Sequence, residues 1–170
     1  MLYLKEANTE DVEKEYEFIT NTPENENGFI NENHGCTREE FENIVLPEYI
    51  NYSQGINLKD NHVPQTTFFL WDDDKIVGMF KLRHYLNEAL AKGAGHIGYG
   101  ICKEFRGRGC ASEGLRLTIE KAKEIVKDDE IYLSVNKNNL PSLKVQLKNG
   151  AYIHHEDEEE FYTRISNKGK

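Results

Sequence analysis

The sequence has too few cysteines, too widely spaced, to build a disulfide framework or a structural zinc site. Cys36, Cys102 and Cys110 are an odd number among 170 residues and form no Cys-x-x-Cys pair, so we expect no metal and a reduced environment. A run of about 18 apolar residues, as a membrane-spanning helix needs, is absent. The first ten residues lack the basic and apolar regions of a secretory signal. We therefore expect a cytoplasmic protein without a membrane partner.

The sequence also lacks the broad excess of positive charge that nonspecific nucleic-acid binding requires. Its formal net charge is −9. Residues 1–60 carry 14 acidic and 4 basic side chains, residues 61–127 carry 8 and 11, and residues 128–170 carry 8 and 6. The acidic excess can simply solvate surface helices, but the distribution also suits an anionic ligand in the middle and a cationic one near the N-terminal third. We expect no nucleic-acid partner.

The hydrophobic pattern predicts helices early in the chain and a mixture of strands and helices after residue 66. Thr37 and Glu40 form a capping-box pattern, and Pro47 should interrupt or kink the helix that follows. We predict strands over 2–7, 66–72, 76–86, 96–103, 130–135, 151–155 and 159–165, helices over 9–19, 37–53, 110–125 and 138–150, a loop over 21–35 and a link over 87–95. The order β-α-α-β-β-β-α-β-α-β-β predicts a single domain of the α+β class, with the three-layer arrangement also seen in α/β proteins. Its central sheet should be mixed, largely antiparallel and flanked by helices.

Two glycines and two arginines stand together in residues 106–109, just before a predicted helix. Glycine is a poor helix former, so helix stability does not explain this cluster. The first N–H groups of a helix have no partner within it, and the helix dipole adds positive charge there. The cluster therefore predicts an anion cradle, best suited to a diphosphate, with an ordinary tight turn as the alternative. The P-loop pattern is absent, and Ser112 breaks the dinucleotide fingerprint, so ATP is the weaker ligand hypothesis.

Arg106, Gly109 and Ala111 resemble the R/Q-x-x-G-x-G/A signature of the GNAT superfamily of acyl-CoA N-acyltransferases. The stretch GHIGYGICKEFRGRGCASEGL is similar to the strand-loop-helix core of that superfamily, and NKNNLPSLKVQLKNGA is similar to its next element. RHYLN before GHIGYG resembles a bacterial subgroup of its acetyltransferases. The resemblance covers residues 66–165, whereas the N-terminal third is similar only in its β-α-α layout.

The resemblance implies one acetyltransferase domain over residues 1–170, with an acceptor side in 1–60 and a coenzyme-binding core in 66–165. It implies that the loop amides hold the coenzyme A pyrophosphate and that the strand before the loop pairs with the pantetheine arm. Asn139 would lie near that arm or simply cap its helix. The implied coenzyme-binding residues are Tyr99, Gly100, Ile101, Arg106, Gly107, Arg108, Gly109, Cys110, Ala111, Ser112 and Asn139.

The catalytic residues are where the sequence departs from the family pattern. His96 stands near the position of the usual strand carboxylate, and His84 on the neighbouring strand is the second candidate for the general base. A buried, hydrogen-bonded histidine is the alternative for His96. Gln146 occupies the position where many members have a tyrosine that protonates the leaving thiolate. We assign Arg83 and Asn87 to substrate binding, with a solvent-exposed strand end as the alternative.

The predicted function is therefore an acetyl-CoA-dependent N-acetyltransferase. The acetyl group would pass to a primary amine of a small molecule, peptide or protein by direct attack on the thioester. The departures at Gln146 and His96 leave an alternative, a noncatalytic regulatory module that binds coenzyme A. The acceptor amine, the acyl chain length and the oligomeric state, a homodimer included, are left open.

Overall fold

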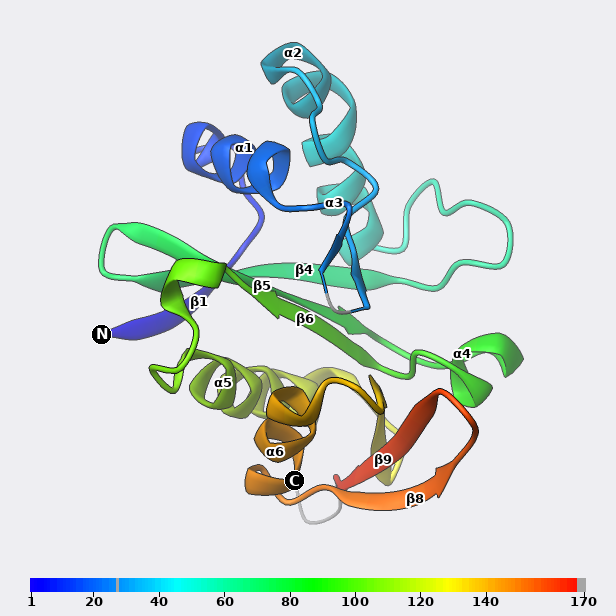
Figure 1. Cartoon of the computed structure of the whole chain (residues 1–170). Coiled ribbons are helices and arrows are strands. Elements are labelled where there is room, and N and C mark those ends of the chain that lie inside the picture. The colour runs from blue at the N-terminus through cyan, green and yellow to red at the C-terminus, as the bar shows by residue number, and fades with distance from the viewer. Residues whose placement is uncertain (27, 168–170) are drawn as a thin grey trace.

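The computed structural model describes residues 1–26 and 28–167, and its elements form layers of helices around strands (Figure 1). The first half contains β1 (Leu2–Glu6), α1 (Val12–Asn21), β2 (Asn25–Glu26), β3 (Phe29–Ile30), α2 (Arg38–Glu40), the π-helix η1 (Phe41–Val45), α3 (Leu46–Ser53), β4 (Gln65–Asp72) and β5 (Lys75–Arg83). The second half contains α4 (Glu88–Lys92), β6 (Ile97–Ile101), the 3-10 helix η2 (Lys103–Phe105), α5 (Cys110–Ile125), β7 (Glu130–Asn136), α6 (Leu140–Lys148), β8 (Tyr152–Glu156) and β9 (Glu160–Ser166).

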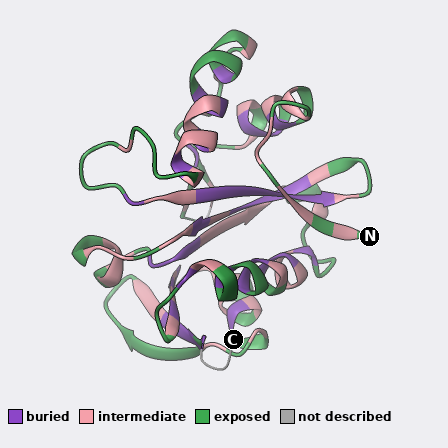
Figure 2. Ribbon diagram, turned by 180° about the vertical axis from the view of Figure 1, so that it is seen from behind, coloured by how far each residue is buried: buried purple, intermediate pink, exposed green. Residues whose placement is uncertain are grey.

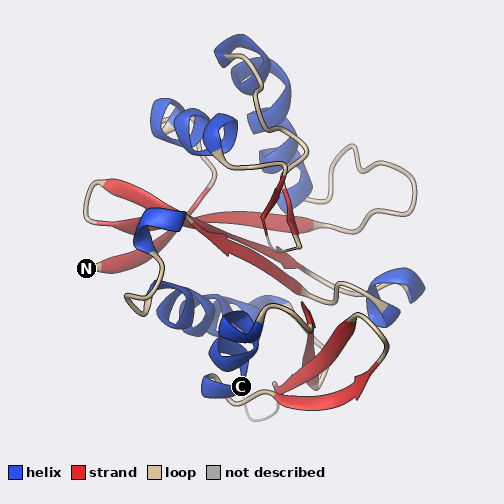
Figure 3. Cartoon of the chain, in the orientation of Figure 1, coloured by secondary structure: helices blue, strands red, loops and turns tan. Residues whose placement is uncertain are grey.

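Two antiparallel sheets carry the fold. One has the strand order β1-β4-β5-β6 and the other the order β7-β9-β8. Within the described residues, one isolated bridge joins the two sheets, between Gly95 just before β6 and Leu133 of β7, and beyond it β6 and β7 diverge. The predicted α+β fold with an antiparallel central sheet flanked by helices is confirmed (Figure 3).

Both faces of the central strands are buried, because helices cover each face (Figure 2). α1 and α3 lie over one face and α5 over the other (Figure 1). Side chains alternate along a strand, so adjacent residues of β4 and β5 enter different cores. Phe69, Trp71 and Met79 pack with α1 and α3, whereas Phe68, Leu70, Phe80 and Leu82 pack with α5.

Gly114 allows α5 to approach the sheet closely. A Cβ atom at this position would lie 2.4 Å from two ring atoms of Phe80 and 3.0 Å from Leu70. The helix would have to move outward to accept any larger residue. This contact fixes the start of α5, and therefore the glycine-rich loop before it, against β4 and β5.

The N-terminal third differs in detail from the prediction. The capping box of Thr37 and Glu40 is confirmed, but Pro47 does not end the helix. The N–H of Leu46 bonds to the carbonyl of Phe41, five residues back, and this π turn widens the helix just before the proline. The widening accommodates the proline ring and its missing N–H.

Two predicted loops contain structure of their own. Residues 21–35, expected to be a loop, include the hairpin of β2 and β3, in which Asn25 pairs with Ile30. The link over 87–95 contains α4, whose first turn is capped by the side chain of Asn87. The first helix begins at Val12, later than the predicted start at residue 9, and Asp11 is its N-cap. The strands β2 and β3 and the helix α4 contain too few residues for a periodic pattern to reveal them.

Candidate functional site

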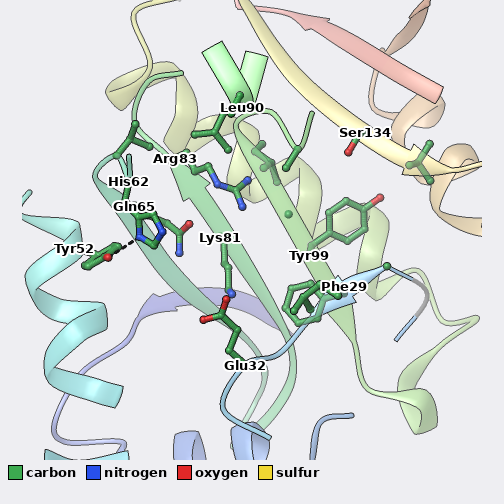
Figure 4. Close-up of a pocket in the computed structure, with 18 of the residues that line it drawn as sticks. Phe29, Glu32, Tyr52, His62, Gln65, Lys81, Arg83, Leu90, Tyr99 and Ser134 are labelled. Carbon is green, nitrogen blue, oxygen red and sulfur yellow. Dashed lines mark hydrogen bonds between the residues drawn. The ribbon is translucent and has the colours of Figure 1, made fainter. Parts of the chain in front are cut away.

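A cavity of about 480 Å³ opens where β6 and β7 diverge. Its floor is the end of β5 and the middle of β6, and its walls come from the β2–β3 hairpin, α3, α4 and β7 (Figure 4). The side chains and glycine that define it are Phe29, Glu32, Tyr52, His62, Lys81, Arg83, Leu90, Gly98, Tyr99 and Ser134. The cavity therefore joins residues from both halves of the sequence.

The open edge of β6 offers backbone groups to this space. β6 pairs with β5 in unbroken register from Ile97 to Ile101, and the Cys102 N–H bonds to the Val77 carbonyl of β5. Backbone groups alternate in direction along a strand, so the amides of Tyr99 and Ile101 face the gap toward β7 and that of Gly100 faces β5. Of the predicted triplet 99–101, two residues thus present their main chain to the gap.

The two strand glycines have separate explanations. A Cβ atom on Gly100 would lie 2.9 Å from the ring of Phe29, which packs over the strand at this point. A Cβ atom on Gly98 would meet nothing within 4 Å, because it would project into the cavity. Gly100 therefore seats the β2–β3 hairpin, and Gly98 keeps the cavity floor clear.

The glycine-rich loop lies exposed at the start of α5. Gly107 and Gly109 have φ angles of +77° and +79°, a region that favours glycine, and neither has an atom within 4 Å of its Cβ direction. Glu113 donates the first hydrogen bond of the helix, to the carbonyl of Gly109. The N–H groups of residues 110–112 precede that bond and have no acceptor within the helix. This open set of backbone donors fits a diphosphate.

The two loop arginines differ in their surroundings. Arg106 forms an ion pair of 2.7 Å with Glu26 of β2 and donates from Nε to the carbonyl of Ile101 at 3.1 Å. Arg108 is exposed, with its guanidinium carbon 5.4 Å from the ring centre of Phe105. Arg106 therefore ties the loop to the β2–β3 hairpin, and Arg108 is the arginine with its charge turned to solvent.

Side chains around α6 close the inner end of the gap. Asn139 caps the helix by accepting a hydrogen bond of 3.3 Å from the Ser142 N–H, which is the capping role foreseen. The Tyr99 ring stacks on Phe80, with 5.3 Å between ring centres, and its hydroxyl lies 2.6 Å from Ser142 Oγ. Tyr99 thus connects β6 to α6 across the gap. A coenzyme contact for Asn139 stays a prediction.

Gln146, which the resemblance places where many family members have a tyrosine, is buried. Its amide nitrogen donates to the Ser134 carbonyl at 3.4 Å, and its oxygen accepts from the Thr163 hydroxyl at 2.7 Å. The side chain holds α6 to β7 and β9. An amide has no proton to give at neutral pH, so Gln146 cannot replace the tyrosine as an acid.

His96 lies outside the cavity and is completely buried. Its Nδ1 accepts the Tyr132 N–H at 2.9 Å, and its Nε2 lies 2.9 Å from Asp128 Oδ2. Burial lowers the pKa of His96, and the hydrogen bond to Asp128 opposes that shift. Both ring nitrogens are engaged and no face reaches solvent, so the geometry favours the alternative reading of a buried structural histidine over a general base.

His84 also lies away from the cavity. It follows β5 on the side opposite Arg83, and its Nε2 lies 2.7 Å from the hydroxyl of the buried Thr66. Burial lowers its pKa. The two predicted substrate residues do line the cavity: Arg83 donates to the Gly95 carbonyl at 3.1 Å, and Asn87 caps α4 and donates to the Asn61 carbonyl at 2.8 Å.

Sequence reasoning missed several polar residues of the cavity. Lys81 stands two residues before Arg83 on the same face of β5, and a lysine within an otherwise apolar strand was the available signal. His62 and Tyr52 come from a long loop and from α3, and His62 Nδ1 lies 2.7 Å from the Tyr52 hydroxyl. Glu32 follows β3 and faces Lys81 (Figure 4). No local pattern marks these last three.

A second cavity, of about 580 Å³, lies beyond the β2–β3 hairpin. It is bounded by α1, the turn between β4 and β5, and η2, and Phe29 separates it from the first cavity. Cys102 borders it, and burial raises the pKa of this thiol to about 11. Cys102 therefore stays protonated at neutral pH and is a poor nucleophile.

Comparison with known proteins identifies the family and the fold. Residues 2–152 match the family model described as "Acetyltransferase (GNAT) domain". The chain belongs to the GNAT acetyltransferase family. The resemblance read from Arg106, Gly109 and Ala111 is thereby confirmed. None of the helices in the described part of this GNAT chain is both long and apolar enough to cross a membrane.

Solved structures of GNAT proteins superpose on nearly the whole chain. A probable acetyltransferase matches with a TM-score of 0.73 at 18% identity, over 98% of this chain and 93% of that one. The ribosomal-protein-S5-alanine acetyltransferase from Vibrio fischeri gives 0.66 at 18% identity, over 99% and 94%. Spermidine N-acetyltransferase from Vibrio cholerae, in complex with CoA and spermine, gives 0.63 at 15% identity, over 98% and 95%. These identities show the shared fold alone. A comparison with curated protein sequences found no match.

Proposed function

We propose that this GNAT chain is an acetyl-CoA-dependent N-acetyltransferase that transfers acetyl to a primary amine. The observation that carries the proposal is the continuity of β6. Its residues 97–99 line the cavity, and the strand leads through η2 into the exposed donor loop at the start of α5. One strand thus connects a diphosphate cradle to a cavity with polar side chains, as a long thioester with a phosphate end requires.

The loop and the strand edge would hold the coenzyme. The amides of residues 107–112 would bind its pyrophosphate, with Arg108 adding charge and Arg106 holding the loop through Glu26. The main-chain groups of Tyr99 and Ile101, turned toward the gap, would pair with the pantetheine arm. Acetyl-CoA would supply the activated acetyl group.

The acceptor would occupy the cavity above β5. Its neutral amine would attack the thioester carbonyl, so that a C–N bond forms, the C–S bond breaks and the amine loses one proton. His62 lines the cavity and is exposed, and we assign it to accept that proton. The tautomer in which Nδ1–H donates to Tyr52 leaves the Nε2 lone pair available to a water or the amine. His62 replaces His96 and His84 in our proposal for the base.

Coenzyme binding tests the first part of the proposal. Gly109→Glu places a carboxylate in the cradle, and because the Cβ direction is open, the cost to the fold is the left-handed backbone alone, about 1–2 kcal/mol. Gly35→Glu is the matched control, since Gly35 has φ +75° and an equally open Cβ direction. We expect calorimetry to detect acetyl-CoA binding in the wild type and the Gly35 variant and not in the Gly109 variant. Equal affinity in both variants would refute the cradle.

Thioester cleavage with a panel of amines tests the second part. Release of the coenzyme thiol, matched by mass of an acetylated amine, is the expected result. Acetyl-CoA binding without transfer to any amine would instead support the noncatalytic coenzyme A-binding module.

A further inference from the structure

Two cations of β5 lie on the floor of the cavity. Lys81 and Arg83 are two residues apart, so both side chains leave the same face of the strand. Lys81 is paired across the sheet with Gly98, which has no side chain to cover it. Figure 4 shows both cationic groups turned into the cavity.

Within the described part of the chain, neither cation forms an ion pair. The Lys81 ammonium lies 5.5 Å from the ring centre of Phe29. One nitrogen of Arg83 donates to the Gly95 carbonyl, which orients the guanidinium and leaves its other N–H groups without a protein acceptor in the described residues. Burial lowers the pKa of both side chains, and repulsion from Arg83 lowers that of Lys81 further, whereas the charges of Glu32 and Glu48 oppose that shift.

Two neighbouring, partly buried cations with no directly paired carboxylate are costly, because each has lost water and they repel one another, and Glu32 and Glu48 offset only part of the charge on Lys81 from a distance. The cost disappears when an anion enters the cavity between them. The coenzyme's pyrophosphate does not fill this role in the proposed function, because its cradle lies beyond the other end of β6.

Carboxylates stand at the rim. Glu32 is exposed and faces Lys81 across the opening (Figure 4). Glu48 of α3 lines the same wall and lies 3.6 Å from the ammonium of Lys59. The cavity thus has a cationic floor and an anionic rim, an arrangement complementary to a molecule that carries both a carboxylate and an amine.

We propose that the acceptor is an amino acid or a similar small amine with a carboxylate, whose carboxylate is bound by Lys81 and Arg83. This inference rests on the proposed acetyltransferase function and names its substrate class. The guanidinium of Arg83 can offer paired N–H donors to a carboxylate, and Lys81 adds a point charge from the adjacent position. The carboxylate is unchanged in the reaction: its role is to hold the neighbouring amine near the thioester.

The test compares probes that differ only in charge. We would measure kcat/KM by thiol release for the standard amino acids, their carboxamides and the corresponding decarboxylated amines, with phosphoethanolamine as a phosphate-bearing probe. We expect at least one amino acid to exceed its own carboxamide by about tenfold or more, the effect of losing a charged hydrogen bond. Calorimetry can also measure how tightly the N-acetylated amino acid binds in the presence of coenzyme A, and this measurement does not depend on turnover.

Variants assign the effect to the two cations. Lys81→Met and Arg83→Gln should each remove most of the preference for the carboxylate over the carboxamide, and Arg83→Lys should keep part of it. Lys75→Met is the matched control, because Lys75 is exposed at the start of the same strand and does not line this cavity. The Lys75→Met control should keep the full preference for the carboxylate over the carboxamide. Only variants whose melting temperature is unchanged are compared.

The possible failures are distinct. Transfer to carboxamides or decarboxylated amines at equal or higher efficiency, a higher efficiency with phosphoethanolamine, or a preference that survives in Lys81→Met and Arg83→Gln would overturn this inference and leave the acetyltransferase function standing. Absence of transfer to every probe would overturn both.

Discussion

A buried carboxylate in α1 makes a quantitative prediction about stability. Glu15 is fully buried, and its Oε2 accepts the Asn8 N–H at 3.0 Å. Its Oε1 has no hydrogen-bond partner among the described residues. Burial raises the pKa of Glu15 from 4.5 to about 7. The folded protein therefore disfavours the carboxylate relative to the acid by about 3–4 kcal/mol, at about 1.4 kcal/mol for each unit of pKa.

The sign follows from the two states. In the unfolded chain Glu15 ionises above its ordinary pKa of 4.5, whereas in the folded chain it stays protonated up to about pH 7. The free energy of unfolding therefore falls as pH rises from 4.5 to 7 and levels off above that. Glu15→Gln cannot ionise and keeps the oxygen that accepts from Asn8. Its stability relative to wild type should rise by about 3 kcal/mol between pH 4 and pH 8.

Urea denaturation of both proteins at a series of pH values measures this difference, because other titrating groups cancel in the subtraction. Glu17→Gln, on the exposed side of the same helix, is the control for removing a carboxylate from α1. A Glu15→Gln difference that stays constant from pH 4 to pH 8 would refute the claim that burial of Glu15 disfavours its ionised form.

Three further predictions concern the site. Gly98→Val should leave the melting temperature unchanged or raise it, because valine suits a strand and its Cβ meets open space, yet it should raise the acceptor KM by about tenfold or more by filling the cavity. Arg106→Ala should weaken acetyl-CoA binding by about three- to tenfold, because the loop amides remain, and Glu26→Gln should reproduce part of that loss if Arg106 acts by holding the loop. His62→Gln should lower kcat by about a hundredfold, because the variant lacks the general base. The control His84→Gln should change kcat by less than about twofold. Equal effects of the two substitutions on kcat would remove His62 from the mechanism.

The sequence alone was sufficient for several features that depend on residues close together in the chain. The donor loop is contiguous, and its two left-handed backbone positions are both glycines, so a short motif revealed it. The capping box at Thr37 and the alternation of β4 and β5 are equally local. Such features are set by backbone sterics and by side chains a few residues apart, and these act before any tertiary contact forms.

The tertiary structure alone decided which polar residues share the cavity. Histidine is chemically suited to accept a proton at any position, but His96 became unavailable because Asp128 and the Tyr132 amide, more than 30 residues away, occupy its ring nitrogens. Lys81 became part of the site because Gly98 of the neighbouring strand leaves space above it. Burial and accessibility depend on what packs against a residue from distant parts of the chain, and a local pattern carries no information about those partners.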